Sequence, residues 1–275
     1  MMIFLAARAQ VISGDGLDIY VEDKGRGDTT LLFIHGWNLD HSFWKNQIDV
    51  FRKEYRCVAP DLPGYGKSGK DRSEWTMRAY GSDIREIIDQ LELENVILIA
   101  HSMGGNIALE CLMLNPSGII GMVGVDNFKE VGTLPDSATQ QQMQQFYQML
   151  EENYPVNVRM AAEGFMFHPE SPAGPKEEVL SAYALADPTV AIPVVKAAFT
   201  ESSREAGQLE KISIPFALIS STNIPFSQEL FLRYYAGSRF KNFELHGTGH
   251  FPMYERPVMF NDALKEALEF IFGLE

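Results

Sequence analysis

Residues 96–105 (VILIAHSMGG) constrain the fold more than any other part of the chain. An apolar run leads into Ser102, and the small residues Ala100 and Gly104 stand two positions to either side of it. The run predicts a buried strand and the sequence behind it predicts a helix, so the serine lies on a tight turn that needs small neighbours. An ordinary strand-to-helix junction has the same pattern, so the motif alone leaves both interpretations open.

A serine on such a turn is a candidate nucleophile. The turn exposes the Ser102 hydroxyl and directs the Met103 backbone N–H, at a helix N-terminus, toward the place where an oxyanion forms. Acyl transfer also needs a base, an acid that orients the base, and a second N–H donor. The loop after the apolar residues 31–34 contains Gly36, which permits a sharp turn, so the Trp37 N–H is the second candidate donor.

His250 is the candidate base. It lies in a glycine-containing loop between a predicted strand at 240–245 and a predicted helix at 258–272, where it can return over the edge of the sheet. A histidine on a surface loop is the alternative. We interpret His101 as a support for the turn, because neighbours on a tight turn point apart, and His246 as structural. For His168, a substrate contact and a plain loop role both stay open.

Strand-like and helical segments alternate along most of the chain, which predicts a mostly parallel sheet with ligands at the carboxyl ends of its strands. The first two strands are expected to form an antiparallel hairpin, because residues 13–16 (SGDG) are too few for a parallel crossover. We predict strands at 9–13, 17–22, 30–34, 55–59, 95–100, 119–125, 214–220 and 240–245, and helices at 41–53, 76–92, 103–114, 227–236 and 258–272.

The alternation breaks between residues 128 and 210, where helical stretches follow one another without a convincing strand. We therefore divide the chain into a core, residues 1–127 and 211–275, and an inserted helical cap, residues 128–210. Most apolar side chains of the insertion are expected to pack helices together. The candidate substrate contacts are Phe128, Met143, Phe146 and Phe165.

Charge excludes several classes of partner. The chain of 275 residues has 23 basic and 37 acidic residues and a net charge of −14, which disfavours nucleic acid and anionic lipid. No apolar run approaches the roughly 20 residues that span a bilayer, and residues 1–9 lack the basic start of a signal peptide. We expect a cytoplasmic protein, a monomer or a homodimer, whose partner is a small-molecule substrate, without metal or other cofactor.

Four segments in this order resemble the α/β-hydrolase superfamily over essentially the whole chain: 33–37 (FIHGW), 61–69 (DLPGYGKSG), 100–105 (AHSMGG) and 249–252 (GHFP). The resemblance implies an α/β fold with an eight-stranded, mostly parallel sheet, a helical lid between strands six and seven, and a Ser-acid-His triad. It also implies that Asp61 shapes a loop near the site, a structural role rather than a catalytic one.

The acid departs from the commonest pattern of that superfamily. Most members have an aspartate after strand seven, where this chain has Asn223. An asparagine holds an imidazole but does not stabilise its positive charge, and such a change costs roughly 10⁴-fold in the serine protease template. Asp126 lies at the carboxyl end of predicted strand six, and in the strand order that the resemblance implies, this end is one strand from Ser102 and two from the strand before His250. Some superfamily members take their acid from this position, so Asp126 is our candidate, with a structural capping role as the alternative.

These residues predict a serine hydrolase that cleaves a small, largely apolar ester through an acyl-enzyme on Ser102. Resemblance to members with a similar elbow keeps carbon–carbon bond hydrolysis of diketones open. The serine argues against dehalogenase and epoxide hydrolase mechanisms, since those members use a nucleophilic aspartate. A second class of function is a weakly active ligand-binding protein on the same scaffold. The asparagine at position 223, where most members have the acid, suggests this alternative.

Overall fold

The computed structural model describes residues 7–274, so the expectation about a signal peptide concerns residues that lie mostly outside the described part. Eight strands form one sheet, in the order β1-β2-β4-β3-β5-β6-β7-β8. The eight-stranded, mostly parallel sheet predicted from the sequence is confirmed. The strands are β1 (Ala7–Ile12), β2 (Asp18–Lys24), β3 (Thr30–Ile34), β4 (Arg56–Pro60), β5 (Val96–His101), β6 (Ile119–Val125), β7 (Phe216–Ser221) and β8 (Phe240–Leu245).

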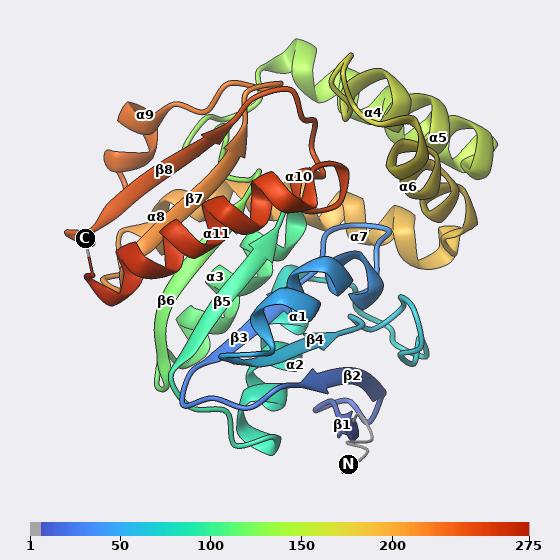
Figure 1. The fold of residues 1–275 in the computed structure, drawn as a ribbon. Coiled ribbons are helices and arrows are strands. Elements are labelled where there is room, and N and C mark those ends of the chain that lie inside the picture. Colours follow the sequence, from blue (N-terminus) through green and yellow to red (C-terminus); the bar gives the residue numbers. More distant parts are fainter. Residues whose placement is uncertain (1–6, 275) are drawn as a thin grey trace.

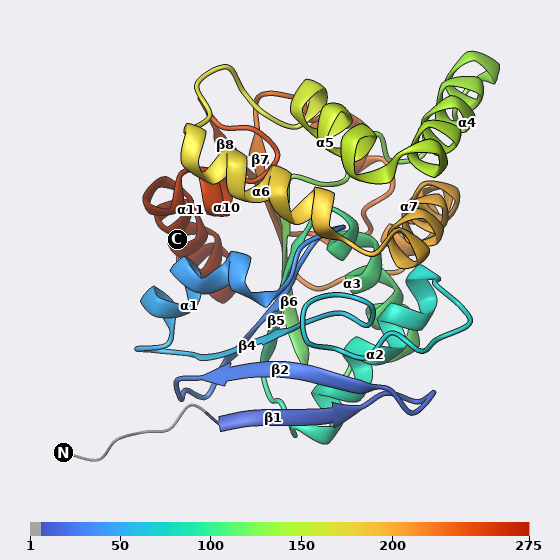
Figure 2. The same cartoon turned by 90° about the vertical axis from the view of Figure 1, so that its right-hand side faces the viewer.

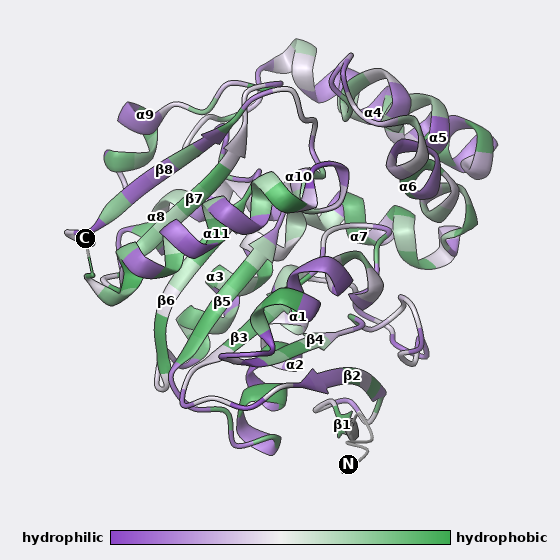
Figure 3. Ribbon diagram, viewed as in Figure 1, coloured by the Kyte–Doolittle hydropathy of each residue, from purple (hydrophilic) through white to green (hydrophobic). Residues whose placement is uncertain are grey.

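The two kinds of strand pairing follow from the connections. The short turn after Ile12 makes β1 and β2 an antiparallel hairpin, and β2 also pairs antiparallel with β4. From β4 to β8 every pairing is parallel. Strands β3, β5 and β7 are buried along their whole length, as expected for parallel strands covered on both faces. Figure 3 shows these central strands as hydrophobic, while β2 at the side of the sheet is largely hydrophilic.

Helices cover both faces of the sheet (Figure 1). One face is covered by α1 and α11, and the other by α2, α3 and α8. The helix α2 begins where Thr76 accepts a hydrogen bond from the Ala79 N–H, and α11 ends at Gly273 in the left-handed conformation. The bounds are η1 (His41–Trp44), α1 (Lys45–Phe51), α2 (Met77–Gln90), α3 (Met103–Leu114), α9 (Gln228–Leu232), α10 (Pro252–Glu255) and α11 (Pro257–Phe272).

Two of these helices differ from the sequence-based expectation. The helix α9 ends at Leu232 rather than near residue 236, because the chain turns there and the Tyr235 hydroxyl donates to the Ile214 carbonyl at 2.5 Å. The short helix α10 was not predicted. It begins with Pro252, directly after the loop that carries His250, and Pro is well suited to the first turn of a helix.

The segment between β6 and β7 is helical throughout, apart from its connecting turns. Its first four helices lie above the carboxyl ends of the strands (Figure 2). Asp136 and Asp187 cap the N-termini of α4 and α7 with their side chains. The segment contains α4 (Ser137–Glu152), α5 (Tyr154–Phe165), α6 (Ala173–Leu185), α7 (Pro188–Glu201), η2 (Ser202–Arg204) and α8 (Glu205–Leu209).

Within residues 7–274, no single helix is both long and apolar enough to cross a membrane. Only the bent pair Ala173–Leu185 and Pro188–Leu209 reaches the required length and composition when its two parts are counted together, and these parts meet at 104°.

Candidate active site

The turn between β5 and α3 holds Ser102 in a strained backbone conformation, with φ 52° and ψ −123°. Two glycines make this possible. A Cβ on Gly104 would come within 2.7 Å of the Ile34 carbonyl oxygen, and one on Gly36 within 3.1 Å of the Ser102 Cβ. The loops after β3 and β5 are therefore in direct contact, and the sharp turn leaves the Ser102 side chain partly exposed above the sheet.

The structure brings Ser102, His250 and Asp126 together from three different strand ends. His250 Nε2 lies 2.8 Å from Ser102 Oγ, and His250 Nδ1 lies 2.6 Å from Asp126 Oδ2. Because an ionised carboxylate only accepts hydrogen bonds, Nδ1 carries the proton and Nε2 is left to accept from the serine hydroxyl. The three side chains thus form the chain of contacts that removes a proton from a serine.

Asp126 is buried at the carboxyl end of β6, with an exposed fraction of 2%. Burial favours the neutral acid, but the hydrogen bond and charge of His250 and the charge of Lys129 outweigh it and lower the pKa of Asp126 to about 2. The second carboxylate oxygen, Oδ1, accepts from the backbone N–H and hydroxyl of Ser221 at 2.8 and 2.9 Å. Asp126 is therefore ionised and held at both oxygens.

Sequence reasoning did not identify the residues that hold Asp126. Lys129 places its Nζ 2.8 Å from Asp126 Oδ1 and also donates to the carbonyls of Ser221 and Ile224. A lysine three residues after a candidate acid is a signal that the sequence offered. Asn223 lies partly buried in the loop after β7, and within the described residues it has no hydrogen bond to His250.

The candidate oxyanion donors lie on the two touching loops. Met103 is the first residue of α3, and Trp37 lies in the loop after β3. Among the described residues, neither backbone N–H has a hydrogen-bond acceptor in the protein, so both are free for an oxyanion. The Trp37 indole contacts the helical segment between β6 and β7, where it donates to the Ala191 carbonyl of α7 at 2.9 Å. His35 supports the same loop by accepting from the Leu62 N–H at 2.9 Å.

His101 contacts the base loop rather than Ser102. Its Nε2 lies 2.8 Å from the His250 carbonyl oxygen, so it donates there. Burial, together with the charge of His250, lowers the pKa of His101 to about 3, which keeps its imidazole neutral. On the other side, the His250 N–H donates to the Met166 carbonyl at 2.7 Å. The loop that carries His250 is thus held between the turn at Ser102 and the helical segment between β6 and β7. His246 is exposed and away from these contacts, while His168 lies in the cap loop.

A cavity of about 260 Å³ opens in front of Ser102. Of the four candidate substrate contacts, Phe128 and Phe146 line this cavity. Phe165 does not, because it ends α5 on the outer side and is 76% exposed, and Met143 packs against the hydrophobic core instead. The residues that line the cavity are Trp37, Ser102, Met103, Asn106, Asp126, Asn127, Phe128, Phe146, Met166, Tyr183, Val195, Ala198, Phe199, Ser202 and Glu205.

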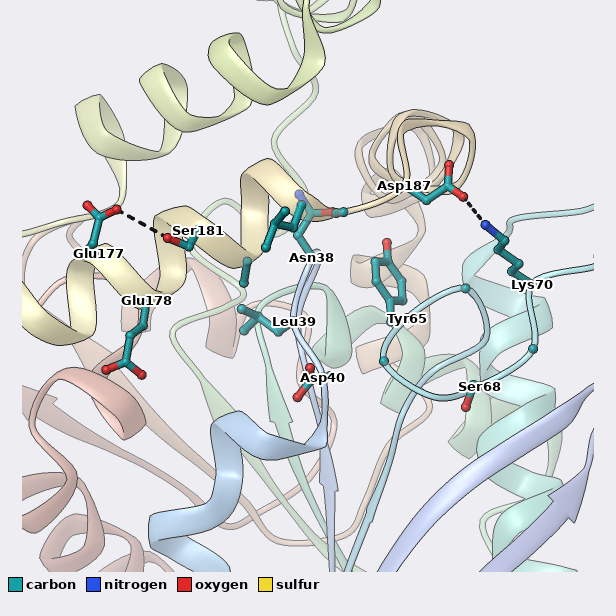
Figure 4. A pocket seen from close by; sticks show the side chains of 16 residues that line it. Asn38, Leu39, Asp40, Tyr65, Ser68, Lys70, Glu177, Glu178, Ser181 and Asp187 are labelled. Carbon is teal, nitrogen blue, oxygen red and sulfur yellow. Dashed lines mark hydrogen bonds and ion pairs between the residues drawn. The ribbon is translucent and has the colours of Figure 1, made fainter.

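A larger hollow of about 810 Å³ lies between the loops after β3 and β4 and the cap helix α6 (Figure 4). Lys70 of the core and Asp187 of the cap form an ion pair across it, at 2.6 Å. Ser102 lines the smaller cavity and does not line this hollow, so the smaller cavity is the candidate substrate site.

Within the described residues, Asp40, His41 and Asp61 form one group whose ligand atoms lie within 4.8 Å of one another. Protein donors already occupy these atoms. Asp61 accepts from the backbone N–H and the ring of His41 at 2.8 and 2.6 Å, and from the Lys67 N–H at 2.8 Å. These bonds shape the loop after β4, and we assign no metal to the group.

Comparison with known proteins places this arrangement in a family. The family model for the α/β hydrolase fold matches residues 29–192, more than half of the chain. An esterase from Exiguobacterium antarcticum superposes with a TM-score of 0.84 at 26% identity, covering 96% of this chain and 100% of that one. A bromoperoxidase from Bacillus anthracis, at 23% identity, gives a TM-score of 0.81 over 96% of this chain and 100% of its own, and shows the fold alone.

Curated relatives match over shorter segments. The AB hydrolase superfamily protein YisY from Bacillus subtilis is 37% identical over 92 residues, which is 33% of this chain and 34% of that protein. The chain spans about a third of the length of the curated relatives it matches. The family match and the eight-stranded sheet agree with each other, and the chain belongs to the α/β-hydrolase fold family.

Proposed function

We propose that this protein is a serine hydrolase that cleaves a small carboxylic ester through an acyl-enzyme on Ser102. One observation carries the proposal: His250 lies 2.8 Å from the serine oxygen and 2.6 Å from an ionised, buried aspartate. The likeness to the Exiguobacterium antarcticum esterase supports the same reaction class. The proposal gives Asp126 the role of the triad acid and leaves Asn223 outside the triad.

The geometry supports a two-step reaction. Ser102 Oγ attacks the ester carbonyl carbon while its proton passes to His250 Nε2, and the carbonyl electron pair moves onto the oxygen. The N–H groups of Trp37 and Met103 hold that oxyanion, and Asp126 stabilises the imidazolium. Collapse of the intermediate expels the alcohol, which takes the proton from His250. A water molecule then attacks the acyl-enzyme, with His250 again as base, and releases the acid.

The cavity supports a small substrate with a largely apolar body. Its volume of about 260 Å³ is near the lower end of small-molecule sites. Its walls come from the core and from the helical segment between β6 and β7, so we propose that residues 128–210 act as a cap that sets the size of the substrate. We propose a small molecule as the partner of this site.

The test is hydrolysis of p-nitrophenyl esters of increasing acyl length by the wild type and by Ser102→Ala. We expect turnover of the shorter esters and its loss in the variant, with a fall on the order of 10⁴-fold or more. Ser203→Ala, which removes an exposed serine, is the matched control and should retain full activity. Equal hydrolysis by wild type and Ser102→Ala would contradict the proposal. Turnover of a diketone but of no ester would favour the carbon–carbon hydrolase instead.

A further inference from the structure

A second buried carboxyl group lines the candidate active-site cavity, and the triad does not use it. Glu205 is the first residue of α8 and has an exposed fraction of 9%. Asn106 donates its side-chain amide to Glu205 Oε1 at 2.6 Å. Asn106 lies one helical turn beyond Ser102 on α3, about 6 Å along the helix axis from the rise per residue. The cavity therefore has a reactive end at Ser102 and an acidic end at Glu205.

Glu205 has no cationic partner in the described part of the chain. No lysine or arginine is among the residues that line the cavity. The neighbouring Arg204 instead pairs with Glu110 at 2.9 Å and with Glu201 at 3.5 Å. Burial raises the pKa of Glu205 to about 7, and the hydrogen bond from Asn106 only partly opposes it. A buried carboxylate in this position costs free energy unless a ligand supplies the missing positive charge.

Aromatic rings form much of the wall of the same cavity. Trp37, Phe146 and Phe199 line the same cavity as Glu205, together with Phe128 and Tyr183. The faces of aromatic rings attract cations, and organic ammonium groups are bound in proteins by rings of this kind combined with a carboxylate. A carboxylate ligand would meet Glu205 and Asp126 with no positive side chain to receive it. The lining therefore favours a cationic ligand over an anionic one.

We propose that Glu205 and Asn106 form a subsite for an organic ammonium group, so that the substrate is an ester with an ammonium group a few carbon atoms from the scissile carbonyl. This inference rests on the proposed function, because it uses the same cavity. In it, Glu205 accepts from the ammonium group through the oxygen that Asn106 leaves free, and the aromatic walls cover the carbon chain. Glu205 is a specificity residue here and takes no part in bond breaking.

The test measures binding without turnover. Butylammonium, 1-butanol and butyrate are titrated calorimetrically into Ser102→Ala at about pH 8, above the pKa of about 7 of Glu205. We expect butylammonium to bind at least about tenfold more tightly than butanol, as for a hydrogen bond to a charged group, and butyrate to bind more weakly than butanol. The preference should disappear in the double variant Ser102→Ala/Glu205→Gln, which keeps an acceptor for Asn106.

The matched control is Ser102→Ala/Glu210→Gln, which removes the same charge from an exposed position five residues along the chain and should keep the preference. Circular dichroism checks that each variant is folded. Equal affinity for butylammonium and butanol, or a preference that survives Glu205→Gln, would overturn the inference. Because Ser102 is absent from all these variants, the binding result is independent of ester hydrolysis. Selective binding without wild-type esterase activity would contradict only the proposed function. Esterase activity without selective binding would contradict only this inference.

Discussion

Two regions meet at one cavity: the carboxyl ends of the strands, here called the edge, and the helical segment between β6 and β7, our proposed cap. They are built under different constraints. At the edge, Ser102 and Asp126 have positive φ values of 52° and 48°, and their side chains are fixed by short hydrogen bonds. In the cap, large apolar side chains such as Phe165 and Leu185 are 76% and 84% exposed. Strain at functional residues persists only where the surroundings over-determine it. In our proposal, the edge carries the chemistry and the cap sets which substrates reach it.

The two regions contact each other at the loops that carry His250 and Trp37. The His250 N–H donates to the Met166 carbonyl, and a Cβ on Gly249 would come within 2.3 Å of the same oxygen. The Trp37 indole donates to the Ala191 carbonyl of α7. The helical segment between β6 and β7 therefore supports the loop that carries His250 and the loop that carries Trp37, our candidate base and oxyanion donor. Substitutions at the edge should change the rate of the chemical step, and substitutions in the cap should change substrate binding.

The largest effect is expected at the edge, in Asp126→Asn. The variant keeps the shape of the side chain but neither fixes the reactive tautomer of His250 nor stabilises its positive charge, so kcat should fall by roughly 10⁴-fold. Steady-state kinetics with a short-chain ester measures it. Asn223→Ala is the control and should change kcat little. A large loss in Asn223→Ala with near-normal Asp126→Asn would move the acid to the strand β7 side.

A smaller effect is expected where the cap begins, in Lys129→Met. Loss of the ion pair with Asp126 should lower kcat by roughly tenfold, the size of one charged hydrogen bond. It should also raise the pKa of Asp126 from about 2 toward its usual value. Since a lowered aspartate pKa stabilises the fold only above that pKa, acid unfolding of the variant should begin at higher pH. Thermal melts between about pH 2 and pH 5 measure this, with the exposed Lys265→Met as control.

Phe146→Ala and Phe165→Ala compare a side chain of the cap that lines the cavity with one on its outer side. Phe146 lines the cavity, so its truncation removes apolar contact with bound substrate and should raise KM roughly tenfold with kcat nearly unchanged. Phe165 is mostly exposed, and its truncation should leave both constants unchanged. The same KM change in both variants would mean that the substrate lies elsewhere in the cap.

The last expected effect is on stability rather than on turnover, and it concerns Glu205. The raised pKa of Glu205 means that ionisation opposes folding as pH rises from 4.5, its ordinary value, to about 7. Glu205→Gln removes this cost, so the variant should exceed the wild type in free energy of unfolding by on the order of 3 kcal/mol at about pH 8. At about pH 4 the two should be equal. Urea melts at both values measure it, and an equal difference at both would contradict the expected charge effect.

The contrast between edge and cap also explains what the sequence could predict. The turn at Ser102 and the strand ends are local patterns with strict backbone demands, so a mostly parallel sheet could be predicted from them, while the order of its strands came from the resemblance to the α/β-hydrolase superfamily. Asp126 could be proposed because strand order fixes which tips are neighbours. The cap offers no such rule. Helical periodicity does not say which helices of this segment face the cavity, so Phe165 on α5 was expected there and Glu205 on α8 was not.

The most direct test of the central claim is the reactivity of Ser102 toward a fluorophosphonate, measured by mass spectrometry and by the rate of labelling. We predict one covalent label per chain, on Ser102, absent in Ser102→Ala and formed orders of magnitude more slowly in His250→Ala. A folded wild-type protein that takes no label, or that is labelled at the same rate without His250, would contradict it.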